Sequence, residues 1–164
     1  MNITLRQTWI ALAILGAVVL ALLLNRLIVT DKKRIERTVQ EMADAVAKGD
    51  IDLLFSHISE DYRNDTQSRT ELRSLVTAAL GRFEHVNPKI QRVPVNISGM
   101  LAHVEISVSG SVESGGARMP MGTSEWVAEF RKEADQAWRV TSITPVRVEG
   151  RDVSSWHDVT RVFE

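Results

Sequence analysis

An uninterrupted apolar run stands near the amino-terminal end of the chain. Residues 9–24 carry no polar side chain, and a helix of this run would be about 24 Å long at a rise of ~1.5 Å per residue. Continued to Val29, the helix reaches about 31 Å, close to the ~30 Å hydrocarbon core of a bilayer. Arg26 is compatible with it because its head group can reach the interface. The pattern predicts a single-pass transmembrane anchor in residues 1–30.

A cleaved signal peptide is the alternative to a retained anchor. Such peptides have an apolar region of about 7–15 residues, followed by a cleavage site with small residues at alternate positions. Here the run is longer and its small residues lie inside it. The following residues, 24–29, contain no such site. We therefore expect the chain to keep the anchor and to contact membrane lipid through residues 9–29.

The flanking charges bear on the side of the membrane that the domain occupies. Arg6 alone precedes the run, whereas Lys32, Lys33, Arg34 and Arg37 follow it. The positive-inside rule then predicts a cytoplasmic domain. Export behind a single amino-terminal anchor is the alternative, and the absence of cysteine fits either compartment. Lys32, Lys33 and Arg34 are interpreted as a solvated helix start that also sets the topology. Contact of these three residues with anionic lipid head groups, if the domain is cytoplasmic, is the alternative.

After the anchor, apolar residues recur with a helical period. The stripe of the first predicted helix consists of Ile35, Val39, Met42 and Val46. Gly49 is a plausible residue to end that helix. Asp50 can cap a short second helix that carries the apolar positions up to Ile58, and residues 60–65 are expected to be extended.

A third helix follows the extended piece. Ser68 and Glu71 fit the capping-box spacing, in which each side chain accepts a hydrogen bond from the other residue's backbone amide. The apolar positions that come after them continue to Gly81, where this helix is expected to end.

From residue 89 the period changes to two, which is typical of strands. The predicted strands are residues 89–97, 101–109, 121–131 and 137–148. Pro94 interrupts the first of them and favours an edge strand or a bulge. In the second strand Val104 and Ile106 face one way, and His103 and Glu105 face the other. Helices followed by antiparallel strands predict an α+β fold in which three helices cover one face of a curved sheet.

Composition narrows the function classes. After Thr30 the chain has 18 basic and 21 acidic residues, a balance that does not resemble a nucleic-acid-binding surface. The four histidines lack the spacing of a metal site and there is no cysteine to join them. We therefore predict no metal, no cofactor and no nucleic acid partner, and we expect a polar tail in residues 150–164.

The order of elements resembles the nuclear-transport-factor-2-like (NTF2-like) cone, also called SnoaL-like or cystatin-like. The resemblance rests on the first-helix stripe, on residues 48–54 (KGDIDLL) and 59–65 (SEDYRND), on the third helix and the sheet, and on residues 137–140 (AWRV). It covers residues 31–149, about three quarters of the chain. It implies the fold; because the superfamily contains isomerases, dehydratases, hydrolases and assembly domains, it does not imply an activity.

The ketosteroid isomerases of this fold offer a test of a catalytic role. They use an Asp base, with a Tyr and a protonated Asp that hydrogen-bond the developing enolate oxygen. Aligned on the shared Gly-Asp, these positions fall on Thr66, Met42 and Trp126. Asp65 is one residue out of register, which on a strand turns a side chain to the opposite face. The resemblance therefore does not carry the isomerase chemistry to this chain.

Two functional hypotheses remain open. The first is a membrane-anchored, non-catalytic binding or assembly module that holds a small apolar ligand or a protein partner, with a homodimer through the sheet face compatible with it. The predicted pocket-lining residues are Met42, Val46, Val104, Ile106, Trp126 and Phe130. The second is a hydrolase, lyase or isomerase that uses Asp65, Tyr62 and His57 as acid and base groups inside the cone.

The anchor is directly testable in the purified protein. Amino-terminal sequencing of membrane-extracted chains should find residues 12–24 still present, because no cleavage site follows the apolar run. Chains that begin after Thr30 would contradict the anchor. Protease treatment of spheroplasts tests the orientation separately: the cytoplasmic interpretation expects the domain to be protected.

Overall fold

The computed structural model describes residues 30–64 and 67–153. The chain divides into two units, residues 1–33 and 34–164, and the fold described below is that of the second unit, which contains α2 (Asp31–Lys48) from Arg34 onward. Within the described residues no helix is both long and apolar enough to cross a membrane. The predicted anchor at residues 9–29 lies outside the described residues, as do Asp65, Thr66 and most of the predicted tail.

Three described helices form the first half of the domain: α2 (Asp31–Lys48), α3 (Ile51–Ser56) and α4 (Arg69–Leu80). The chain leaves α2 through Gly49, whose φ of 67° is a left-handed conformation that glycine adopts without strain. The Asp50 side chain caps α3 by accepting a 2.9 Å hydrogen bond from the amide of Leu53. Ser68 and Glu71 form the predicted capping box of α4. The local helix signals are therefore confirmed.

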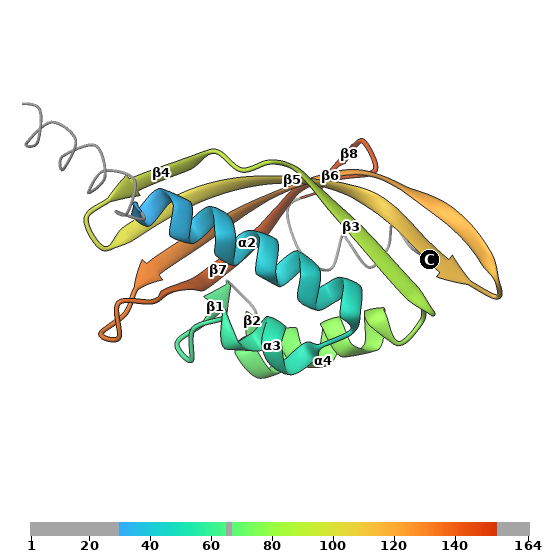
Figure 1. Cartoon of the computed structure of the whole chain (residues 1–164), viewed down its shortest axis with the longest axis horizontal. Coiled ribbons are helices and arrows are strands. Elements are labelled where there is room, and N and C mark those ends of the chain that lie inside the picture. The colour runs from blue at the N-terminus through green and yellow to red at the C-terminus, as the bar shows by residue number, and fades with distance from the viewer. Residues whose placement is uncertain (1–29, 65–66, 154–164) are drawn as a thin grey trace, which may run out of the picture. The chain divides into compact units, whose positions relative to one another are not determined.

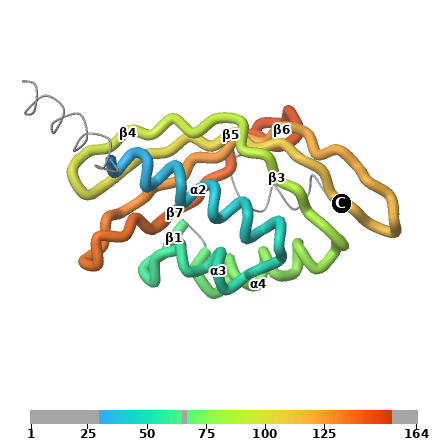
Figure 2. Tube along the Cα trace, viewed as in Figure 1, coloured from blue at the N-terminus to red at the C-terminus, as the bar shows by residue number. Residues whose placement is uncertain are grey.

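The second half is an antiparallel sheet. Its strands are β3 (His85–Arg92), β4 (Val95–Ser98), β5 (Leu101–Ser114), β6 (Ala117–Lys132), β7 (Trp138–Val148) and β8 (Arg151–Asp152). The order is β3-β5-β6-β7-β8, and β4 also pairs with β5. A separate two-stranded piece, β1 (Arg63–Asn64) with β2 (Gln67–Ser68), joins α3 to α4. Figures 1 and 2 show all three helices on one side of the curved sheet. The α+β fold with a curved antiparallel sheet is confirmed.

The strands are longer and more irregular than their sequence period predicts. The edge strand expected in residues 89–97 begins already at His85 and breaks at Pro94 into β3 and β4. The β5–β6 register shifts between Val108 and Gly110. At that point a side chain could not replace the hydrogen of Gly110, because a Cβ there would lie 2.2 Å from the carbonyl oxygen of Asn87. Such register shifts bend and twist a sheet, which here allows it to curve around the helices.

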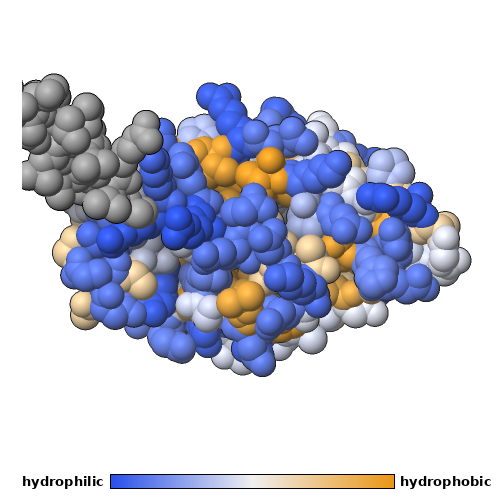
Figure 3. Space-filling model, in the orientation of Figure 1, coloured by the Kyte–Doolittle hydropathy of each residue, from blue (hydrophilic) through white to orange (hydrophobic). Residues whose placement is uncertain are grey.

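The core fills the space between α2 and the concave side of the sheet. The α2 residues Ile35 and Val39 are 0% and 3% exposed, and Met42 and Val46 pack against the same cluster. On the sheet, Val104 and Phe130 are both fully buried. The predicted stripe and the facing of the strands are thus confirmed. The opposite side of α2 is hydrophilic, as Figure 3 shows.

The side of the sheet that α2 covers and the exposed side of the sheet can be compared in a stability test. Ile35→Ala, which leaves a cavity between α2 and the sheet, should lower the free energy of unfolding by about 2–5 kcal/mol. Glu105→Ala, on the exposed face of β5, should change it by less than about 0.5 kcal/mol. Urea unfolding of both variants measures the difference. Equal losses would contradict the packing of α2 on this sheet face.

Candidate functional site

The segment that follows α3 pairs with β7 through its backbone. The Ser59 amide donates to the Val140 carbonyl oxygen at 2.9 Å, and the Val140 amide donates to the His57 carbonyl oxygen at 3.0 Å. Ile58 forms a parallel bridge with Val140. The helix predicted to continue to Ile58 ends at Ser56. The His57 and Ile58 amides still bond to α3 carbonyls, whereas the His57 carbonyl and the Ser59 amide bond to β7 and turn the chain into the sheet.

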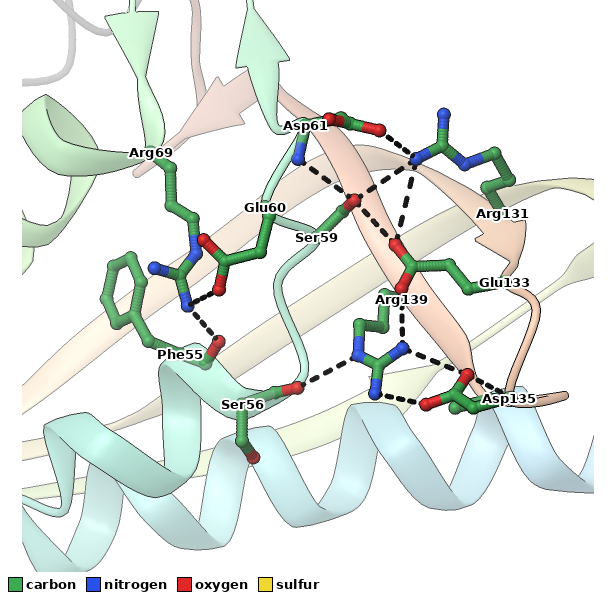
Figure 4. A network of polar contacts seen from close by, with 11 residues as sticks. Phe55, Ser56, Ser59, Glu60, Asp61, Arg69, Arg131, Glu133, Asp135 and Arg139 are labelled. Atoms are coloured by element: carbon green, nitrogen blue, oxygen red, sulfur yellow. Dashed lines mark hydrogen bonds and ion pairs between the residues drawn. The ribbon is translucent and has the colours of Figure 1, made fainter.

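A polar network fixes this segment to the turn between β6 and β7 (Figure 4). The Ser59 hydroxyl, on a residue only 1% exposed, donates to Glu133 Oε1 at 2.6 Å. Arg139 Nη1 donates to the other oxygen of Glu133 at 2.5 Å. Arg131 donates to Asp61 Oδ2 at 2.7 Å. Each charged group in this network has a partner of opposite charge, so the network is a structural support.

The guanidinium of Arg139 is the most constrained of these groups. It donates to Asp135 Oδ2 at 2.6 Å and to Asp135 Oδ1 at 3.1 Å, and its Nε donates to the Ser56 carbonyl oxygen at 3.4 Å. The hydrogen bond from Arg139 lowers the pKa of Asp135, and the hydrogen bond to Asp135 raises the pKa of Arg139. Both side chains are therefore charged at neutral pH, and the arginine is held in one orientation.

Beside this network lies a surface pocket of about 400 Å³, here called the arginine pocket. It is lined by Arg34, Arg37, Thr38, Ser56, His57, Gln136, Ala137, Trp138 and Arg139. Three of these residues are arginines and none is acidic. The first turns of α2, the end of α3 and the start of β7 thus together build a pocket with a cationic lining.

Two buried nitrogen atoms belong to residues of this lining. Within the part of the chain that the structure describes, His57 Nε2 and Trp138 Nε1 have no hydrogen-bond partner. His57 Nε2 lies 3.6 Å from Glu41 Oε2, too far for a hydrogen bond. Burial lowers the pKa of His57, Glu41 opposes this shift and Arg139 adds to it. His57 is therefore neutral at pH 7, and the positive charge of the pocket comes from its arginines.

A second, smaller pocket of about 270 Å³ lies next to β1. Its lining consists of Glu60, Asp61, Tyr62, Arg63, Ser68, Arg69 and Thr70. Arg69 donates to the Phe55 carbonyl oxygen at 3.0 Å and lies 3.2 Å from Glu60 Oε1. Acidic and basic side chains balance one another in this lining, so it has no marked preference for a ligand charge.

The structure separates two of the residues predicted as an acid and base set. His57 lines the arginine pocket, whereas Tyr62 is 1% exposed and lines the smaller one. Asp65, the third member, lies outside the described residues. The set therefore stays a prediction.

The predicted pocket-lining residues lie mainly in the core. Val104 and Phe130 are fully buried, and Met42, Val46 and Ile106 pack against the same cluster. Trp126, opposite Ile106 on the sheet, is partly buried. These six residues line neither of the two pockets described above.

Sequence reasoning missed the residues that build the arginine pocket. The sequence pattern indicates a basic helix start for Arg34, and it marks neither Arg37 nor Arg139 as a site residue. One signal was present: Arg34 and Arg37 are three residues apart, a spacing that places side chains on one helix face. Among the described residues no group of three or more His, Asp or Glu side chains is arranged to hold a metal ion.

No protein-family model matches this chain, and a search of curated proteins found no match. Solved structures do match. An NTF2-like protein with a cystatin-like fold from Novosphingobium aromaticivorans is 14% identical, with a TM-score of 0.61 over 90% of this chain and 92% of that one. A "putative dehydratase from the NTF2-like family" of Streptomyces avermitilis is 15% identical, with a TM-score of 0.60 over 69% of this chain and 93% of that one.

A third structure carries a different name on the same fold. A "putative aromatic ring hydroxylase" from Novosphingobium aromaticivorans is 18% identical, with a TM-score of 0.63 over 78% of this chain and 95% of that one. At such identities the similarity shows the fold alone. The described domain therefore has the NTF2-like, cystatin-like fold that the sequence resemblance implied, and its function must be argued from its own residues.

The buried imidazole predicts a pH-dependent stability. The pKa of His57 is lower in the folded protein than its ordinary value of 6.5, so the unfolded chain binds more protons in this range. The neutral His57 side chain contributes fully to the free energy of unfolding above pH 6.5, and this contribution is lost as the pH falls through the pKa of His57 in the folded protein. Urea unfolding between pH 5 and pH 8 should show a smaller loss on acidification for His57→Gln than for the wild type.

The exposed His85 at the start of β3 provides the matched substitution. His85→Gln should follow the wild-type curve. If His57→Gln also follows it, the burial of the imidazole does not affect the stability of the fold.

Proposed function

We propose that this protein is a membrane-anchored, non-catalytic binding module whose arginine pocket takes a small anionic ligand bearing a carboxylate or a phosphate. The observation that carries the proposal is the lining of the pocket, which has three arginines and no acidic residue. Its volume of about 400 Å³ falls within the ~300–1,000 Å³ typical of small-molecule sites.

The arginines differ in how fully their charge is compensated. Arg139 is bonded to Glu133 and Asp135, so it contributes an oriented donor and little net charge. Arg37 has no ion pair or hydrogen bond among the described residues, and it contributes a full positive charge. Planar guanidinium groups suit the paired oxygens of carboxylates and phosphates. A bound anion would supply the negative charge that balances the arginines of the lining.

The non-catalytic part of the proposal rests on which groups share a pocket. An acid and base mechanism needs two titratable side chains that reach one substrate atom. His57 and Tyr62 line different pockets. Met42, at the position where the isomerases carry a tyrosine, packs on the core and has no hydroxyl.

An acid and base enzyme is the second candidate, and one observation favours it. His57 is buried beside a pocket and its pKa is lowered, so it is a neutral base at pH 7. A hydrolase, lyase or isomerase would use it with Asp65 and Tyr62, and this requires Asp65 to reach the same pocket because Tyr62 lines the other one. With the proposed anchor in residues 9–29, either the binding module or the enzyme would act at a membrane. The positive-inside rule would place the domain on the cytoplasmic side.

Ligand binding can be tested with simple anions. Calorimetric titration of the detergent-solubilised full chain with inorganic phosphate, and separately with benzoate, should detect binding of at least one of them. Arg37→Gln should weaken that binding about tenfold or more, since a hydrogen bond to a charged group contributes ~1.5–3 kcal/mol. Arg92→Gln, the same change at an exposed arginine outside the pocket lining, should have no effect.

Equal effects of the two substitutions would contradict a specific site in the arginine pocket. The enzyme alternative has its own test. Ester, epoxide and enone substrates are screened with the wild type and with Asp65→Asn. Turnover that disappears in the variant would replace the binding module with the enzyme.

A further inference from the structure

The turn between β4 and β5 exposes a small group of large apolar side chains. Met100 is 58% exposed, Leu101 is 57% exposed and Ile97 is 40% exposed. Ser98 pairs with Leu101 in the register of this hairpin, so these residues stand together at its tip. Exposed apolar side chains that stand together often mark a surface that contacts a membrane or another protein. This group is here called the apolar tip.

The apolar tip has a rigid support. The amide of Lys132 at the end of β6 donates a 2.8 Å hydrogen bond to the Met100 carbonyl oxygen. Leu101 pairs with Arg131 on the same strand. The turn is therefore held against β6 and cannot easily fold its side chains back toward the core.

The apolar tip lies at the end of the domain where α2 begins. Figures 1 and 2 both show the β4–β5 turn and the first turns of α2 at one end, and the β5–β6 turn at the other. The described part of α2 starts at Asp31, directly after Thr30. In the sequence, only Thr30 separates the apolar run of residues 9–29 from the first residue of this helix.

The charges at this end suit an anionic surface. The first two turns of α2 contain Lys32, Lys33, Arg34 and Arg37, against the acidic Asp31 and Glu36. Lys132 stands beside the apolar tip, whereas the guanidinium of Arg131 next to it is paired with Asp61. The nearby acidic residues of the β6–β7 turn, Glu133 and Asp135, are bonded to Arg139. Exposed apolar side chains with basic residues on a neighbouring helix are typical of a surface that inserts shallowly into a lipid interface.

We propose that the apolar tip inserts into the head-group region of an anionic bilayer, with the basic residues of the first α2 turns contacting lipid phosphates. The inference rests on the proposed anchor, which brings this end of the domain to the membrane. It goes beyond the anchor because it gives the folded domain a fixed orientation, with the arginine pocket close to the lipid surface.

A site-specific fluorescent probe tests this in the full chain. The protein has no cysteine, so Met100→Cys can be labelled alone with an environment-sensitive dye. The labelled chain is reconstituted into vesicles of phosphatidylcholine with 30% phosphatidylglycerol, chosen as a practical composition (about a third anionic lipid). We expect a blue-shifted emission that lipids with a shallow nitroxide label quench at least about twofold. Vesicles of phosphatidylcholine alone should give less quenching.

Met119→Cys is the matched control, because Met119 is 44% exposed and pairs with Val112 near the β5–β6 turn. Its probe should keep the emission of a water-exposed dye and should not be quenched by the lipid label. Quenching of both probes to the same degree would overturn the proposed orientation. A blue shift at position 100 without lipid quenching would also overturn it, because a second protein chain would then cover the apolar tip.

The anchor and the inference fail in different ways. Carbonate extraction that releases the chain from the vesicles would contradict the anchor, and with it the basis of the inference. A chain that resists extraction while the probe at position 100 stays in water would overturn the inference alone. A final variant, Lys33→Gln, changes an exposed basic residue of α2 outside the arginine pocket and should reduce the quenching at position 100 in anionic vesicles. Unchanged quenching would contradict the contact between α2 and lipid phosphates.

Discussion

The backbone pairing at Val140 holds the two halves of the domain together. Its amide and carbonyl are both bonded to the segment after α3, which turns the chain into the sheet and places His57 beside β7. The Ser59–Glu133–Arg139 network reinforces the same joint with charged hydrogen bonds. Because α2 packs against the sheet on the same side, the arginine pocket forms where these elements meet. The pocket thus depends on the joint.

The fold is shared with proteins named as enzymes, and the proposed function rests on the side chains that this chain places on it. A curved sheet covered by helices supplies a scaffold, and the side chains placed on it decide the chemistry. Here the described interior near α2 is filled by the side chains of the core, among them Phe55 and Phe130. The cationic side chains gather instead at the surface beside β7. This distribution favours recognition of an anion over conversion of a buried substrate.

The fold was predictable from the sequence because its signals are local. The α2 stripe, the Asp50 cap and the Ser68–Glu71 capping box each depend on residues within one helix or at its end, and the structure confirms all three. The site was not predictable from the sequence, because the residues in contact there are distant in the chain: Ser59 and Glu133 are 74 positions apart. Periodicity carries no information on such pairs, nor on the backbone pairing at Val140 that turns the chain from α3 into the sheet.

The indole of Trp138 offers the most direct test of the central claim, that an anion binds in the arginine pocket. Its N–H has no partner within the described residues, and the chain contains three other tryptophans as internal references. Phosphate titration of the ¹⁵N-labelled full chain, observed through the tryptophan indole signals, should shift the Trp138 signal in a saturable way and leave the Trp126 signal in place. Equal shifts of both signals, or none at all, would contradict a ligand site beside β7.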